Sequence, residues 1–292
     1  MLMDVMLMER HEQPFRDKQF IFEPMIDGQR LLLSFMDSKA RLFTKHHNEV
    51  TRQYPELLKV PLVSPADVVL DGEVAYVNPI TGKVEFESLL ERYRMKKQPR
   101  IRDGVAELPL RYFVFDVLYY NGIDMRERPL IERKRLLNEL IVNNEHFRKM
   151  PYIEEEGDKM FEVIKQLNLE GMAGKRKDSV YSEGHHEDWL KIVNYRYAKV
   201  ELVGWRKNRL GWLARMDGRD VGIIEHGITQ TQRKLFDLNM VRSEEDRDFV
   251  YAKQGMMAAV KYRNWSKDGK LRGAELDQLF PVAAEIAETN IQ

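Results

Sequence analysis

The sequence predicts an α+β protein of two domains, and three observations predict it. The chain has 292 residues, a length that favours two domains over one. Strand-like segments alternate with helix-like segments over the first two-thirds of the chain. After about residue 196 the strands become short and closely spaced. We therefore expect a mixed domain at residues 1–196 and a smaller β-rich domain at residues 197–292.

The elements of the first domain follow from residue type and spacing. Apolar, β-branched and aromatic runs between turn residues predict strands, and the turn pair Asp37-Ser38 predicts a hairpin between two of them. Apolar residues at helical spacing predict two amphipathic helices, in one of which Arg133 either interrupts the apolar stripe or covers it with its stem. The predicted strands are 20–22, 31–35, 42–44, 68–77, 112–118 and one from Gly171, and the predicted helices are 130–140 and 160–167.

The second domain is predicted to be a small β-barrel. Strands are predicted at 199–205, 212–216, 221–225 and 257–262, and a helix at 230–238 separates the third strand from the fourth. Short strands with a helix in this place favour an OB-fold β-barrel. Periodicity alone leaves open any other small β-rich domain.

Composition narrows the class of protein. Hydrophobic residues make up 43% and charged residues 32%, which is typical of a soluble globular chain. No apolar run reaches the 18 residues of a spanning helix, and the opening MLMDVMLMER lacks the basic region and cleavage site of a signal peptide. Cysteine is absent, which excludes disulfides and thiolate metal sites. We expect a cytoplasmic protein with no membrane partner.

The net charge of zero argues against a nucleic-acid partner, but the distribution of charge does not. Residues 191–292 hold 18 Lys and Arg against 14 Asp and Glu. A denser basic run lies elsewhere and consists of Arg92, Arg94, Lys96, Lys97, Arg100 and Arg102. Such a run is most often a solvated face, and the alternative is a patch that contacts DNA phosphates.

Five segments contain residues that could take part in catalysis or ligand binding. They are Glu23–Arg30, Asp71–Glu73, Phe115–Gly122, Glu170–Lys175 and Trp189–Lys191. Together they offer the carboxylates Asp27, Glu73 and Glu170, the cations Arg30, Lys175 and Lys191, and the aromatic Phe115. Carboxylates without His or Cys suit Mg²⁺ (or Mn²⁺) in the company of phosphates, cations suit phosphate charge, and an aromatic face suits a base. Each segment alone is weak evidence, because Asp-Gly is a common turn and a Phe in an apolar strand is more often core.

In this order the segments resemble the motifs of the covalent nucleotidyltransferases, and most closely those of short bacterial and phage ATP-dependent DNA ligases. The family's K-x-D-G-x-R motif is matched by 25–30 except at its first residue, its F-D by 115–116, and its E-G with a later basic residue by Glu170 and Lys175. The resemblance covers nearly the whole chain. It implies a nucleotidyltransferase domain of antiparallel sheets with flanking helices, ATP-grasp-like in architecture, followed by an OB-fold domain.

The resemblance also implies roles for individual residues. Glu23 would accept a hydrogen bond from the adenine amino group, and Phe115 would stack on adenine. Arg30 and Glu73 would hold the ribose, and Lys191, alone or with Lys175, would contact the α-phosphate. Glu170 with Glu73 would serve Mg²⁺, and Asp27 would assist the final attack by a 3′-hydroxyl. Lys45, Arg94, Lys97 and Arg272 would contact DNA.

Met25 occupies the position of the family's nucleophilic lysine. A thioether cannot form the phosphoramidate that lysine forms with AMP, although methionine is equally long and flexible. Three explanations are open: an engineered substitution, a natural loss, or an ordinary core methionine read in the wrong register. We favour substitution by design, because a natural loss should let other active-site positions drift, and these still fit the motifs: Glu23, Glu73, Phe115, Glu170 and Lys191. A further departure is Val193, where the family has a second lysine; another is the absence of an R-x-D-K pattern after Arg272.

The sequence thus predicts an ATP-dependent DNA ligase that binds ATP or AMP and nicked duplex DNA as a monomer, in DNA repair or replication, but fails to charge itself with AMP. Two rival functions are kept open. One is an RNA ligase or capping-type nucleotidyltransferase, and the other is a nick-binding module without catalysis.

Overall fold

The computed structural model of the protein describes residues 3–280. It divides into two compact units, Met1–Asn194 and Tyr195–Gln292, each of which is described by itself. Within residues 3–280 no helix combines the length and the apolar character needed to cross a membrane.

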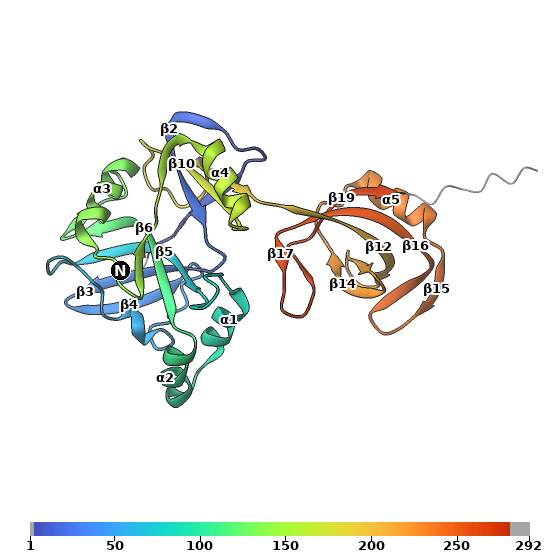
Figure 1. Ribbon diagram of the computed structural model, residues 1–292, viewed down its shortest axis with the longest axis horizontal. Coiled ribbons are helices and arrows are strands. Elements are labelled where there is room, and N and C mark those ends of the chain that lie inside the picture. The colour runs from blue at the N-terminus through green and yellow to red at the C-terminus, as the bar shows by residue number, and fades with distance from the viewer. Residues whose placement is uncertain (1–2, 281–292) are drawn as a thin grey trace, which may run out of the picture. The chain divides into compact units, whose positions relative to one another are not determined.

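Unit 1 contains two sheets (Figure 1). The first sheet has the order β1-β11-β10-β2-β9, and its pairs are antiparallel except for β1 with β11. Its strands are β1 Met6–Arg10, β2 Arg16–Met25, β9 Ile153–Glu156, β10 Gly171–Arg176 and β11 Gly184–Val193. The polar segment Gly184–Val193 was not predicted as a strand.

The second sheet has the order β4-β3-β5-β6-β7, with β8 paired to β6. The predicted hairpin between β3 and β4 is confirmed, and both Asp37 (φ 49°) and Ser38 (φ 61°) adopt the left-handed conformation of a tight hairpin turn. The strands are β3 Gln29–Met36, β4 Lys39–Thr44, β5 Val68–Tyr76, β6 Leu110–Tyr120, β7 Ile123–Asp124 and β8 Phe147–Lys149.

Helices pack against both sheets. The α-helix α3 (Leu130–Leu140) packs on β6, α4 (Gly157–Gln166) packs on β2 and β10, and α1 (Phe86–Arg94) packs on β5. The remaining helical segments are α2 (Gln98–Glu107) and the short 3₁₀ helix η1 (Pro55–Leu57).

A cluster of buried apolar side chains lies where the two sheets face each other. It joins Ile21 and Trp189 of the first sheet to Leu32, Val69 and Phe115 of the second. Since burial of each such side chain contributes roughly 1.5–3 kcal/mol, this cluster holds the sheets face to face. Residues from both sheets therefore come together at its edge.

Arginine 133 does not merely cover the apolar stripe of α3. Its side chain is fully buried and forms an ion pair with the buried carboxylate of Asp116, with an Nε–Oδ1 distance of 2.8 Å. The predicted helix is present, and the arginine that interrupts its apolar stripe forms a buried ion pair with β6.

The described part of unit 2 contains a six-stranded sheet, a two-stranded sheet of β17 and β18, and the helix α5. The long strand β16 pairs with β12, β15 and β19, and β12 continues through β13 to β14. Its elements are β12 Arg196–Arg206, β13 Trp212–Met216, β14 Arg219–Ile224, α5 Gln230–Asn239, β15 Arg242–Glu245, β16 Phe249–Tyr262, β17 Asn264–Trp265, β18 Leu271–Arg272 and β19 Glu275–Phe280. The four predicted strands and the predicted helix are all present. The chain as a whole is a mixed fold with more sheet than helix.

Candidate active site

Three neighbouring strands of the first sheet present predicted site residues on one face. Glu23 on β2 pairs with Ala173 on β10, which in turn pairs with Lys191 on β11. Directly paired residues project to the same face of a sheet, and so do residues two apart on a strand. Met25 lies two residues beyond Glu23 and pairs with Gly171. Glu23, Met25 and Lys191 therefore share one face.

The surroundings of Met25 are open compared with those of its strand neighbours. Ile21, on the same face of β2, is fully buried, whereas Met25 is only partly buried. Opposite it, a Cβ on Gly171 would lie 2.2 Å from the carbonyl oxygen of Ile192, so no side chain can stand at that position. Met25 thus ends β2 beside a place kept free of side chains.

The second sheet contributes a rigid arginine. Arg30 on β3 pairs with Glu73 on β5, and its Nε and Nη2 atoms each lie 2.5 Å from a carboxylate oxygen of Asp71. Tyr181 donates a further hydrogen bond to Asp71 at 2.6 Å. Asp71 is fully buried, and a two-pronged pair of this kind fixes the plane of the guanidinium. The sequence segment containing Asp71 was singled out, but its role as a partner of Arg30 was not.

The aromatic side chain predicted to stack on a base lies between the two sheets. The ring centroid of Phe115 is 4.4 Å from the Arg30 guanidinium and 4.0 Å from the Lys175 ammonium, and Trp189 approaches it edge-on at 6.2 Å. Phe115 is only 6% exposed. Cations at these distances are attracted to the ring face. A base that stacks on Phe115 must first displace one of these two cations.

Glu23 is held by two lysines. Its Oε2 atom accepts from Lys175 at 2.8 Å, and its Oε1 atom accepts from Lys134 of α3. All three side chains are buried. Lys134 was not predicted as a site residue, although it follows Arg133 in the helix sequence. Burial lowers the pKa of Lys175 to about 8, and the adjacent Glu23 carboxylate opposes that change.

This pKa leads to a spectroscopic prediction. The Lys175 ammonium is 3.8 Å from the Trp189 ring centroid, so its deprotonation removes a cation from the indole face. We expect tryptophan fluorescence to show an inflection near pH 8. The Lys175→Gln variant should lack the inflection, and the variant of the partly buried Lys177, Lys177→Gln, should keep it. An unchanged titration in Lys175→Gln would assign the inflection to another group.

Glu73, opposite the start of β3, lies near the carboxylates of Glu170, Asp71 and Asp27. A Cβ on Gly28 would lie 2.3 Å from the Val74 carbonyl oxygen, so only glycine lets the turn after Asp27 press against β5 and Glu73. Burial raises the pKa of Glu73 to about 8 against the opposing charge of Arg30, and the nearby carboxylates of Glu170 and Asp27 add to the rise. Such crowding is relieved by a cation. Among residues 3–280 no group of three or more His, Cys, Asp or Glu is arranged to hold a metal ion by itself.

The predicted DNA-contacting residues are distributed over the surface. Lys45 is exposed after β4, Arg94 and Lys97 are exposed around the α1–α2 junction, and Arg272 is partly buried on β18, where it donates to Asn264 at 3.3 Å. The expectation that the whole basic run is a surface feature was wrong for one member. Arg92 is fully buried and pairs with the buried carboxylate of Glu56 at 2.8 Å. Helical periodicity turns Arg92 inward while Arg94 faces solvent.

Comparison with known proteins agrees with the family predicted from the motifs. Residues 5–192 match the family model described as the ATP dependent DNA ligase domain. The chain is 34% identical over 274 residues to the SPbeta prophage-derived DNA ligase-like protein LigB of Bacillus subtilis (strain 168), covering 93% of this chain and 97% of that protein. It is 31% identical to a DNA ligase of Sulfophobococcus zilligii over 61% of this chain, but spans only 30% of that longer protein.

Solved structures show the same fold at lower identity. A mycobacterial DNA ligase D complexed with ATP and MES superimposes with a TM-score of 0.58 at 23% identity, covering 95% of each chain. A Lig E DNA ligase, described as binding DNA with a minimal scaffold, superimposes with a TM-score of 0.68 at 16% identity, covering 96% of this chain and 100% of that one.

Proposed function

Because this chain belongs to the ATP-dependent DNA ligase family, we propose that it seals nicks in duplex DNA that already carry AMP, and that it cannot form the lysyl-AMP intermediate itself. The observation that carries the second part is the position of Met25. It lies on the sheet face shared by Glu23 and Lys191, is partly exposed, and stands where the family motif has lysine.

The first step of a ligase needs a nitrogen nucleophile at this position. The amine attacks the α-phosphorus of ATP, the bond from that phosphorus to the β-phosphate oxygen breaks, and pyrophosphate leaves. The thioether of Met25 can offer no nitrogen–phosphorus bond. It fills the length of a lysine without a charge, which leaves the fold around β2 intact.

The last step needs no side chain at position 25. The 3′-hydroxyl oxygen attacks the adenylylated 5′-phosphate, a phosphodiester forms, and AMP leaves. Asp27 would accept the hydroxyl proton, and Lys191 would neutralise charge on the phosphate that departs with AMP. Glu73 and Glu170 would hold Mg²⁺ (or Mn²⁺) together with substrate phosphates, where the cation supplies further charge neutralisation. Burial is the main cause of the raised pKa of Glu73, and the nearby Glu170 carboxylate adds to it, so a cation beside these two groups would favour their charged forms.

Duplex DNA would be held by exposed basic residues of unit 1 and by unit 2, which we assign to the OB-fold class. The helix between β14 and the long strand β16 supports that assignment. Lys45, Arg94 and Lys97 would meet backbone phosphates of the duplex, and Arg272 would do the same from unit 2.

A direct test uses a duplex whose nick carries a 5′-adenylate. We expect the protein with Mg²⁺ and no ATP to seal it, while an ordinary 5′-phosphate nick with ATP stays open. Asp27→Asn should slow sealing by roughly 10²- to 10³-fold, because it removes the proton acceptor. Asp37→Asn, an exposed turn position that tolerates asparagine at φ 49°, should leave the rate unchanged.

The same assay separates the alternatives. An adenylylated nick that binds but never seals would contradict the proposal and indicate a nick-binding module. Sealing only when the nick contains ribonucleotides would instead favour RNA as the substrate.

A further inference from the structure

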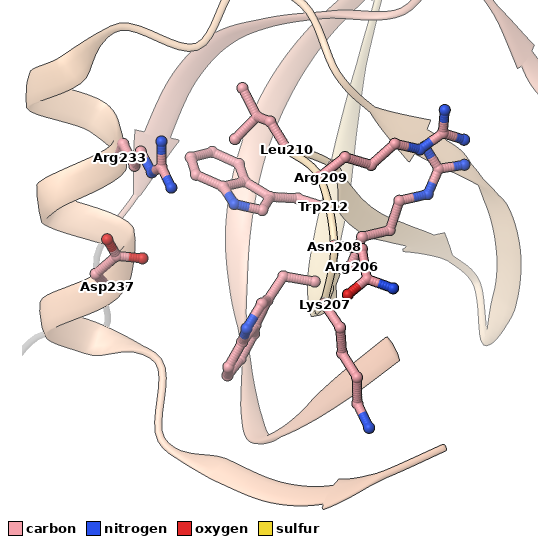
Figure 2. A pocket seen from close by; sticks show the side chains of 10 residues that line it. Arg206, Lys207, Asn208, Arg209, Leu210, Trp212, Arg233 and Asp237 are labelled. Atoms are coloured by element: carbon pink, nitrogen blue, oxygen red, sulfur yellow. The ribbon is translucent and has the colours of Figure 1, made fainter. Parts of the chain in front are cut away.

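Unit 2 contains a pocket of about 370 Å³ that none of the predicted site residues lines (Figure 2). The hairpin loop between β12 and β13 and the helix α5 enclose it. The loop is closed by the pairing of Trp205 with Trp212 and by a hydrogen bond from the Arg206 amide to the Gly211 carbonyl at 2.9 Å. The pocket is therefore built from a defined turn and a helix face.

The floor of the pocket is rigid and aromatic. The indole of Trp212 stacks on Phe236 of α5, with centroids 4.0 Å apart and planes at 11°, and Trp205 meets the same ring edge-on at 5.9 Å. At its N-terminus α5 is fixed by a capping box between Thr229 and Gln232. The loop and the helix therefore need little further ordering when a ligand binds. A preformed site of this kind has a lower entropic cost of binding.

The rim of the pocket is cationic. Of the ten lining residues four are cationic and one is acidic. Arg206 and Arg209 share a single carboxylate, because both lie within ion-pair distance of Glu225. Two guanidinium groups beside one carboxylate leave positive charge and unused donors on this side of the pocket.

Helix α5 supplies the remaining charged side chains. Figure 2 shows Arg233 and Asp237 approaching the indole of Trp212 from the helix, while Arg206 and Arg209 extend together on the other side. Arg233 is exposed, and Trp205 is only partly buried. The pocket thus places cations on two sides of a tryptophan floor.

We propose that this pocket binds an unpaired stretch of a nucleic-acid strand, with its phosphates between the arginines and one base against Trp205. Cationic grooves with aromatic platforms are the recurrent solution for single strands, since every base offers a flat face and every nucleotide a phosphate. In a duplex the bases are stacked on one another and cannot reach the indole. Free phosphate would use the arginines and leave the aromatic floor without a role.

This inference goes beyond sealing, because it concerns unit 2 alone and requires neither a nick nor transfer of AMP. It is tested by binding, so a failed sealing reaction leaves it standing. The probe is a fluorescein-labelled (dT)₁₂ strand titrated with the full chain, in competition with a blunt 12-base-pair duplex or with tripolyphosphate.

The decisive variant reverses two rim charges, Arg209→Glu with Arg233→Glu. We expect at least a tenfold loss of affinity for (dT)₁₂. The slope of log affinity against log salt should fall in magnitude by about 1.4, because two phosphate contacts are lost at about 0.7 each. The matched control is Lys234→Glu, which is the next residue on α5 and does not line the pocket. It should change the affinity less than twofold.

A second measurement reads the aromatic floor. Binding of (dT)₁₂ should quench tryptophan fluorescence, and Trp205→Phe should lose most of that quenching while the circular dichroism of the chain is kept. Equal binding by the double variant and the control would overturn the proposal. So would a duplex or tripolyphosphate that competes as well as the single strand at equal phosphate concentration.

Discussion

Replacing Met25 by lysine is expected to switch on covalent attachment of AMP. The new amine would extend from the end of β2 on the face shared with Lys191, where it meets the α-phosphate of ATP. Loss of a nucleophile lowers a rate by several orders of magnitude, so we expect Met25→Lys to raise protein-bound label from radioactive ATP by at least about 10³-fold. The measurement is the labelled band on a denaturing gel, and the label should be released by acid, as a phosphoramidate is.

The control for this experiment is Met25→Arg. Arginine has the length and charge of lysine but stays protonated, so it cannot attack phosphorus. Met25→Arg should remain unlabelled. Label in the unaltered protein would contradict the proposed function, because it would reveal another nucleophile. No label in Met25→Lys, with ATP binding retained, would indicate that the site lacks more than the amine.

The second large effect is on stability, at Asp71. This carboxylate is fully buried and accepts hydrogen bonds from Arg30 and Tyr181. Asp71→Ala leaves the guanidinium charge buried without its partner, which typically costs about 3–5 kcal/mol. We expect the thermal transition of unit 1 to fall by several degrees, measured by differential scanning calorimetry.

Two comparison variants identify the cause. Tyr181→Phe removes one hydrogen bond to Asp71 and should lower the free energy of unfolding by only about 1 kcal/mol. The double variant Arg30→Met with Asp71→Leu removes both charges and should be more stable than Asp71→Ala alone. A double variant less stable than the single one would mean that lost packing, and not the unpaired charge, dominates.

Local pattern predicted most of the regular structure. Alternating or continuous apolar runs marked β3, β5 and β6, and turn residues marked the hairpin at Asp37-Ser38. Strand β11 was missed because its half-exposed, polar sequence Gly184–Val193 carries little apolar signal. Its pairing with β10 and β1, and not its own composition, makes it a strand.

The candidate site was predicted in its membership but not in its internal contacts. The order of the motifs in the sequence identified Glu23, Phe115 and Lys175 as site residues. In the structure Lys175 contacts both of the other two. Lys134 was missed because its partner Glu23 lies 111 residues away, and nothing in a helix sequence encodes such a distance. For the same reason Arg92 was predicted to lie on the surface, although it is buried and forms an ion pair with Glu56.

The pairing of β1 with β11 has a consequence for biosynthesis. Residues 6–10 find their place in the first sheet only beside residues 184–193, in a parallel pairing that no hairpin can form. During synthesis, β1 therefore cannot pair with β11 until almost all of unit 1 has emerged from the ribosome. Contacts of such long sequence separation slow folding, so the sheet face that bears Met25 and Lys191 is completed at the end of the folding of unit 1.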